Sequence, residues 1–337
     1  MHNQGGQLGG GGADHICATP RSRRSLADSD LRENMRRRGM RIGLIDVDGH
    51  NFPNLCLMKI SAWHKAQGDE VEWYFALGQE YDIVYMSRVF DDQYTQDYQY
   101  PINAKKVVKG GTGYGMDNVL PKEIEHIYPD YSIYPEFHEA YGFLTRGCPN
   151  NCPFCIVSQK EGRKTIKVAD LSEFWNGQKV IKLLDANLLA CREHMDLLQQ
   201  LADSKAYVDF TQGLDARLIN EKNVEILSKI KVKMIHFAFD LMKNEKAIVK
   251  GLDLYKKATN IDARKAGVYV LTNYNTTHEE DLYRCNVISE LGYKPYVMIY
   301  NKPTAPQVTR DLQRWCNNRI IYEATNRNFS NYERGMK

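Results

Sequence analysis

This 337-residue sequence lacks several features that would have directed its interpretation elsewhere. It contains no run of 18 apolar residues and no signal-peptide core, so we expect neither a membrane-spanning helix nor secretion. Its eight cysteines do not form the regular pairs of a disulfide framework, which indicates a reducing, cytoplasmic environment. The net charge of +3 resides in residues 1–39, and the rest of the chain has 38 basic and 38 acidic residues. A neutral folded part does not favour nucleic-acid binding.

Three cysteines lie close together in the sequence. Cys148, Cys152 and Cys155 form a C-x3-C-x2-C pattern directly after an apolar predicted strand. Structural zinc usually has four ligands in two pairs, and no fourth ligand is near: Cys191 lies 36 residues downstream and His138 ten residues upstream. Three thiolates on an iron-sulfur cube leave one iron open to a small molecule. We therefore favour an iron-sulfur cluster, with structural zinc as the alternative.

The cysteine spacing, the aromatic Phe154 before the last cysteine and the strand leading in resemble the radical S-adenosylmethionine (SAM) superfamily. The resemblance implies that Cys148, Cys152 and Cys155 hold a 4Fe-4S cluster whose open iron is chelated by SAM. It further implies that an electron from the cluster cleaves SAM to methionine and a 5′-deoxyadenosyl radical. The implied partners are a cytosolic one-electron donor, flavodoxin- or ferredoxin-like, and a substrate that the sequence does not identify.

The predicted fold of residues 138–320 is a partial (β/α)6 TIM-type barrel, because short apolar strands alternate with helical patterns. The strands are predicted at 140–146, 180–184, 207–211, 234–239, 268–272 and 296–300. Helices are expected over segments such as 195–201, 223–230 and 279–291. A further helix over 309–320 completes the sixth repeat, with Trp315 in the core, and residues 321–337 are expected to form a C-terminal tail.

Polar residues follow four of these strands. The loops after parallel barrel strands converge over one mouth, which makes such residues candidates for binding, although Asp, Asn and Thr also serve as local caps. An Asp-x-Asn after the second strand and a Gln-Gly-x-x-x-Arg after the third resemble segments of cobalamin-associated radical SAM enzymes. By that resemblance the SAM pocket contains Phe154 (through its backbone), Asp185, Gln212 and Arg217. Asn187 and Asp240 could equally face the substrate.

The N-terminal part of the chain divides in two. Residues 1–39 are rich in Gly and Arg and read as a disordered tail or a leader. Residues 40–130 are expected to form a small open Rossmann-like α/β domain. Its strands are predicted at 42–46, 70–74, 83–87 and 106–108, and its helix at 55–67.

Loops beyond these strands resemble a cobalamin-binding pattern of D-x-H-x-x-G, S-x-L and G-G. The cofactor-binding residues assigned by this resemblance are His50 (lower cobalt ligand), Ser87, Gly110 and Gly111 (nucleotide tail). The pattern's glycine is replaced by Pro53 and its leucine by Val89. The alternative is a vestigial sheet in which His50 caps a helix and the glycines make a tight turn.

Two function classes follow. The first is a radical SAM enzyme, acting by hydrogen abstraction or by cobalamin-dependent methyl transfer. A methylthiotransferase is disfavoured because Cys56 is the only cysteine in the folded N-terminal half. The second is a non-catalytic nucleic-acid-binding protein stabilised by a metal or cluster. The acidic, tyrosine-rich segment 90–100 bears on it, but we expect Tyr94, Tyr98 and Tyr100 to pack against the protein rather than stack on bases.

Overall fold

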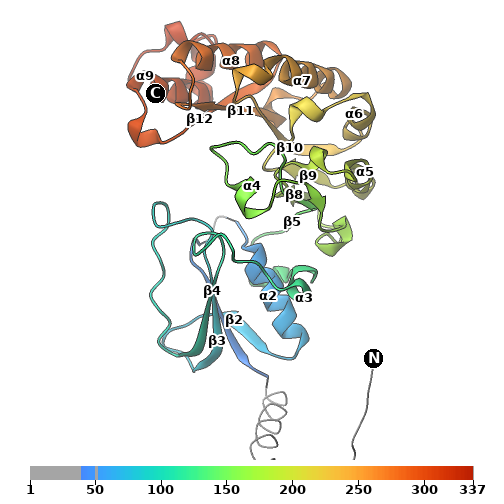
Figure 1. Cartoon of the computed structure of the whole chain (residues 1–337), viewed down its shortest axis with the longest axis vertical. Coiled ribbons are helices and arrows are strands. Elements are labelled where there is room, and N and C mark those ends of the chain that lie inside the picture. Colours follow the sequence, from blue (N-terminus) through green and yellow to red (C-terminus); the bar gives the residue numbers. More distant parts are fainter. Residues whose placement is uncertain (1–38, 50–51, 337) are drawn as a thin grey trace, which may run out of the picture.

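The computed structural model describes residues 39–49 and 52–336, which form two units, each built on a parallel sheet (Figure 1). This mixed α/β architecture agrees with the alternation of strand and helix patterns in the sequence. The predicted leader, apart from its last residue, and His50 lie outside the described residues. None of the helices in the described part of the chain has both the length and the apolar content that crossing a membrane requires.

The smaller sheet has the strand order β2-β1-β3-β4, and every neighbouring pair is parallel. Its strands are β1 (Arg41–Asp46), β2 (Glu70–Trp73), β3 (Tyr81–Ser87) and β4 (Ala104–Gly110), and the helices on it are α2 (Leu55–Ala66) and the short α3 (Lys122–Glu125). Alternate residues such as Ile42 and Leu44 pack against Leu57 of α2 and form a small core. The predicted elements of this unit are all present.

The tyrosine-rich loop after β3 differs from expectation. Tyr94, Tyr98 and Tyr100 are 72%, 45% and 66% exposed, so the expected packing is confirmed only in part: Tyr98 contacts Tyr74 and Tyr94 contacts Phe90, both edge to face. The loop is also held by polar contacts, because the Asp97 carboxylate accepts hydrogen bonds from Lys109 Nζ (2.9 Å) and from the Tyr114 hydroxyl. Because Asp97 holds the loop, the tyrosine rings can remain largely exposed.

The larger sheet has the order β12-β11-β10-β9-β8-β5 and is also entirely parallel. Its strands are β5 (Ala140–Gly142), β8 (Val180–Leu183), β9 (Tyr207–Phe210), β10 (Lys231–Ala238), β11 (Ala266–Thr272) and β12 (Lys294–Ile299). The connecting helices are α5 (His194–Ser204), α6 (Glu221–Leu227), α7 (Glu245–Thr259), α8 (His278–Glu290) and α9 (Gln307–Asn317). Strands that follow one another in this series along the chain are therefore also neighbours in space.

The two faces of the larger sheet differ in chemistry. Ile181, Val208 and Val268 are fully buried and pack with apolar residues of the helices in the main core. The alternate positions carry polar and aromatic side chains, among them Lys182, Asp209, His236, Tyr269 and Tyr296. His236 and Tyr269 stack with their ring planes 6° apart. One face is thus the hydrophobic core, and the other presents groups that can bind a ligand.

The predicted strand at 140–146 is interrupted, because the chain leaves the sheet after β5. It forms a separate hairpin of β6 (Thr145–Arg146) and β7 (Ile166–Lys167), which encloses the cysteine segment. The single helix predicted over 309–320 is also divided, since Asn318 is extended and caps α10 (Arg319–Ala324). The expected C-terminal tail contributes Ile321 and Tyr322 to the core, so the packed unit continues past residue 320.

The edge strand β12 has its outward backbone groups occupied. The side-chain amide of Asn317 in α9 donates to Val297 O (2.9 Å) and accepts from Val297 N (2.8 Å), as a neighbouring strand would. Gln313 Nε2 also donates to Val297 O, at 3.2 Å. These contacts cover the middle of the edge with a helix.

A fully buried arginine ties together the ends of two strands. Arg284 of α8 is 0% exposed. Its guanidinium donates to Phe239 O (2.7 Å) and Asp240 O (2.8 Å) after β10, and to Leu271 O (2.9 Å) in β11. It also donates to the buried Asp281 carboxylate. The charge pair is therefore fully satisfied within the protein.

We expect Arg284→Leu to lower the free energy of unfolding by about 3–5 kcal/mol, because it leaves Asp281 as an unpaired buried charge. Urea unfolding would measure the loss. Arg264→Leu is the matched control, since the Arg264–Asp262 pair is exposed and should matter little. Equal stability of the two variants would contradict the assigned role of Arg284.

Candidate active site

The cysteine segment lies at the carboxyl edge of the larger sheet, where its parallel strands end. It connects β6 to the short helix α4 (Val157–Lys160), and Figure 1 shows α4 between the two units. Cys148, Cys152 and Cys155 are all free and partly exposed. Loops at this edge converge from several strands, which is the usual position of active sites in parallel β/α folds.

Asp185, directly after β8, fixes the point at which the chain leaves the sheet. Its carboxylate accepts hydrogen bonds from Leu144 N (3.1 Å), Thr145 N (2.5 Å) and the Thr145 hydroxyl (2.6 Å). Asp185 is 4% exposed. It was predicted to line a SAM pocket, but it lies beneath the cavity described below and is not among the residues that line it. Its contacts make it a positioning residue for the cysteine segment.

The cysteine segment is held closely against the chain that follows it. Gly147 has φ +89°, and a Cβ atom there would lie 2.1 Å from Lys164 O, so only glycine fits. Cys148 N donates to Gly162 O at 3.1 Å. Residues 161–167 (the basic loop) therefore lean directly on the backbone of the first cysteine.

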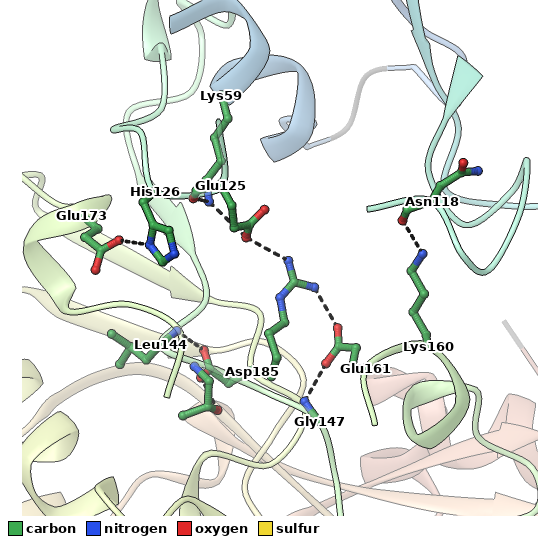
Figure 2. A network of polar contacts seen from close by, with 12 residues as sticks. Lys59, Asn118, Glu125, His126, Leu144, Gly147, Lys160, Glu161, Glu173 and Asp185 are labelled. Atoms are coloured by element: carbon green, nitrogen blue, oxygen red, sulfur yellow. Dashed lines mark hydrogen bonds and ion pairs between the residues drawn. The ribbon is translucent and has the colours of Figure 1, made fainter. Parts of the chain in front are cut away.

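A polar network joins this segment to the N-terminal unit (Figure 2). Arg146 pairs with Glu161 (2.8 Å) and lies 3.9 Å from Glu125. Glu161 also accepts from Gly147 N at 3.0 Å, and Glu125 pairs with Lys59 of α2 at 3.3 Å. The charges alternate, so each member satisfies its neighbours.

The helix after the cysteines, α4, is also attached to the N-terminal unit. Lys160 Nζ donates to Met116 O (2.6 Å) and Asn118 O (2.7 Å), both in the loop after β4. Figure 2 shows Lys160 reaching across to Asn118. The N-terminal unit thus holds the cysteine segment at both ends.

A cavity of about 140 Å³ opens beside the cysteines. It is lined by Asn150, Cys152, Phe154, Ala186, Asn187, Gln212, Gly213, Leu214, Asp215, Arg217, Phe237, Ala238, Asp240, Leu241, Asn244 and Ile248. The structure therefore brings together Cys152 and five other residues that the sequence singled out: Phe154, Asn187, Gln212, Arg217 and Asp240. A shallower cavity of about 570 Å³ adjoins it and shares Asn150, Asp215 and Arg217.

Asp215 and Arg217 form the electrostatic centre of this cavity. Arg217 Nε and Nη2 donate to the two oxygens of Asp215 at 2.8 and 2.6 Å. Burial alone would raise the pKa of Asp215, but hydrogen bonds from Arg217 and Asn150 outweigh it and lower that pKa. The hydrogen bond to Asp215 raises the pKa of Arg217, and the nearby Cys152 and Cys148 raise it further. A permanent cation therefore faces the cysteine sulfurs.

Asn187 has an unused acceptor in the same cavity. It is 2% exposed, and its Nδ2 lies 3.6 Å from Cys148 Sγ and 3.4 Å from Asp215 Oδ2. Its Oδ1 atom is buried without a hydrogen-bond partner among the described residues. A buried acceptor without a donor is costly, so this atom suits a ligand N–H group. The sequence pointed to Asn187 and placed Asp215 among the polar residues after the third strand, but it gave no sign of the free oxygen.

The three thiols fit a three-ligand metal site in donor type and in number. Burial raises the pKa of Cys152, and the nearby Cys155 and Cys148 raise it further, so the three sulfurs act on one another electrostatically. Within residues 39–49 and 52–336, however, no three Cys, His, Asp or Glu side chains converge closely enough to hold a metal ion. The cluster assignment thus depends on the residue types and their placement.

Two of the residues predicted to bind cobalamin, Ser87 and Gly111, have contacts within the protein. The Ser87 hydroxyl, 4% exposed, accepts from Asn54 Nδ2 at 2.9 Å. Gly111 has φ +94°, and a Cβ atom there would lie 2.2 Å from Arg88 O, so this glycine permits a close chain crossing. Gly110 alone faces open space. His50 lies outside the described residues, and the cobalamin site stays a prediction.

Comparison with known proteins adds little to this geometry. No family model matches the sequence, and no curated protein matches it. The crystal structure of Streptococcus suis SuiB bound to S-adenosylmethionine matches 56% of this chain with 13% identity and a TM-score of 0.38. The match covers 48% of SuiB, about half of that protein's length. A likeness this remote assigns neither a fold nor a function to this chain.

The burial of Asp185 predicts a distinct pH dependence of stability. Burial raises the pKa of Asp185 from 3.8 to about 6, although the hydrogen bonds from Thr145 and Leu144 oppose the shift. The folded state then binds the proton more tightly than the unfolded state between pH 4 and 6. We expect this group to make the free energy of unfolding fall by roughly 3 kcal/mol as the pH rises through that window.

Urea unfolding of the wild type and of Asp185→Asn from pH 4 to 7 would isolate this contribution, because the variant lacks the titrating group. Asp262→Asn is the control, since Arg264 lowers the pKa of Asp262 to about 2, outside the window. Parallel pH profiles of the wild type and Asp185→Asn would contradict the prediction.

Proposed function

We propose that this chain is a radical SAM enzyme that holds a 4Fe-4S cluster through Cys148, Cys152 and Cys155 and cleaves SAM reductively. The proposal is carried by one observation: a single cavity brings Cys152, after β6, together with Gln212 and Arg217, which both follow β9. The bound cluster would supply the electron that breaks a carbon–sulfur bond of the SAM sulfonium. Six parallel strands in sequential order support the finer assignment of a partial barrel.

The cavity residues suit the groups that SAM presents. SAM has a zwitterionic methionine head, a ribose diol and an adenine, which need charged and amide partners. Asn187 Oδ1, the free acceptor, would accept a hydrogen bond from the SAM amino group. Arg217 has no hydrogen-bond partner at Nη1 among the described residues and would donate from there to the carboxylate, while Asp215 holds its other edge. Gln212 would bind the ribose hydroxyls, and the backbone of Phe154 the adenine.

The substrate would bind on the helix-free face of the larger sheet. Asp209 and His236 lie on neighbouring strands there, and burial raises the pKa of Asp209. This face meets the cavity at Ala238, two residues beyond His236 on β10. Asp240, at the cavity wall, is the residue best placed to contact both SAM and the substrate.

Hydrogen abstraction is the branch that the site favours over cobalamin-dependent methyl transfer, because Ser87 and Gly111 already have structural roles. The alternative of a nucleic-acid-binding protein gains little from the exposed tyrosines. Asp91, Asp92 and Asp97 lie among them and would repel phosphate groups.

Anaerobic reconstitution tests the metal assignment. We expect the wild type to take up iron and sulfide and to give a reduced 4Fe-4S electron paramagnetic resonance signal that changes when SAM is added. Cys152→Ala should lose most of the iron, because two thiolates do not hold the cube. Cys56→Ala, in α2 of the other unit, is the control and should keep it. Zinc without iron, and no spectral effect of SAM, would favour the binding protein instead.

We expect Arg217→Leu to weaken SAM binding about tenfold or more, because a hydrogen bond between charged groups contributes roughly 1.5–3 kcal/mol. Isothermal titration calorimetry of the reconstituted protein would measure it, with iron content checked first. Arg192→Leu is the matched control, because Arg192 is exposed and lines only the shallower cavity. Unchanged affinity in Arg217→Leu would remove Arg217 from the SAM site.

A further inference from the structure

Reductive cleavage of SAM needs a reductant that this chain does not contain. One electron would leave an external carrier, which is oxidised, and enter the sulfonium. Its carbon–sulfur bond would then break to give neutral methionine and a 5′-deoxyadenosyl radical. The carrier has to dock near the cysteines for the transfer to be fast. This inference rests on the proposed function, and it concerns the surface on which that carrier docks.

The basic loop, residues 161–167, includes exposed residues and contacts the first of the proposed cluster ligands, Cys148. Gly162 O accepts the hydrogen bond from Cys148 N (3.1 Å), which provides a short path from the loop backbone to a cysteine. A Cβ atom on Gly162 would meet nothing within 4 Å, so the tip of the loop is open to an incoming molecule.

The charge of this loop is positive and largely uncompensated. Arg163 and Lys164 are exposed, and neither has an ion-pair partner in the described part of the chain. Lys160, directly before the loop, donates to two backbone carbonyl oxygens and has no ion-pair partner among the described residues. Lys167, at the end of the loop, pairs with Asp170 at 2.5 Å. The acidic Glu161 is neutralised by Arg146. The loop therefore presents more positive than negative charge to solvent.

Two apolar side chains accompany these charges. Ile156 follows the last cysteine and Ile166 opens β7, and both are 55% exposed. Transient redox partners commonly combine small apolar contacts with a charged rim. The tyrosine-rich segment 90–100, the other conspicuous exposed surface, carries acidic residues and would repel an acidic partner.

We propose that Arg163, Lys164, Ile156 and Ile166 form the docking surface for a small acidic one-electron carrier protein. Its carboxylates pair with Arg163 and Lys164, and its redox group faces the backbone of Gly162 and Cys148. Opposite charges steer the encounter and raise its rate, and salt screens both.

The test measures binding and electron transfer separately. Binding of an acidic flavodoxin and of an acidic ferredoxin to the reconstituted full chain is followed by thermophoresis at low and high ionic strength. Carboxylate-to-amine cross-linking with mass spectrometry then locates the contact. Cluster reduction is followed by stopped-flow absorbance, once with the reduced carrier and once with dithionite plus methyl viologen, which need no docking surface.

We expect Arg163→Glu/Lys164→Glu to weaken carrier binding about tenfold or more and to slow carrier-driven reduction, with reduction by dithionite and methyl viologen retained. In the wild type, cross-links should involve Lys164, and binding should weaken with salt. The control is Lys222→Glu/Lys250→Glu, which reverses two exposed lysines on the outer helices α6 and α7 and should bind normally.

Three results would overturn this docking surface: no binding of either carrier at low ionic strength, equal binding by the variant and its control, or binding insensitive to salt. If the cluster of the Arg163→Glu/Lys164→Glu variant is not reduced by dithionite and methyl viologen either, the variant is uninformative about docking. The salt dependence of binding and the position of the cross-links in the wild type then test the docking surface. Failure of the proposed function is recognised separately, because a chemically reduced wild type would then leave SAM intact.

Discussion

The geometry of the whole site depends on one buried carboxylate. Asp185 accepts two backbone N–H bonds at the point where the chain leaves β5, and those groups would otherwise be buried without partners. The same short segment carries Asn187 into the cavity two residues later. The turn after β8 therefore fixes two things. Through Asp185 it fixes where the cysteine segment begins, and through Asn187 it fixes part of the cavity wall beside Cys152. Burial of a carboxylate is costly, and the raised pKa of Asp185 is the measure of that cost.

The N-terminal unit supports the site from the opposite side. Arg146 and Lys160, which lie just before and just after the cysteines, reach Glu125 and the backbone around Asn118. A flexible three-cysteine loop would lose much conformational entropy on ordering around a ligand, and these contacts reduce that loss in advance. The N-terminal unit thus stabilises the cysteine segment, and this role does not require the unit to bind a ligand.

Local patterns made much of this structure predictable. Apolar runs separated by helical periodicity located the strands of both sheets. The family resemblance singled out Gln212 and Arg217, and both line one cavity with Cys152. The features that the sequence did not predict depend on contacts between residues far apart in the chain. The β6–β7 hairpin pairs two residues with two, too few to give a periodicity, and depends on Asp185 some 40 positions away. The exposure of the tyrosines follows from the anchor at Asp97, which no spacing rule indicates.

The covered edge of the larger sheet has a consequence for how these molecules behave at high concentration. A parallel sheet that stops after six strands would normally offer its last strand as a template for another chain. The amide of Asn317 already occupies both backbone groups of Val297, so an incoming strand would have to displace helix α9 before pairing. The six-stranded sheet can therefore end at β12 without forming ribbons through that edge.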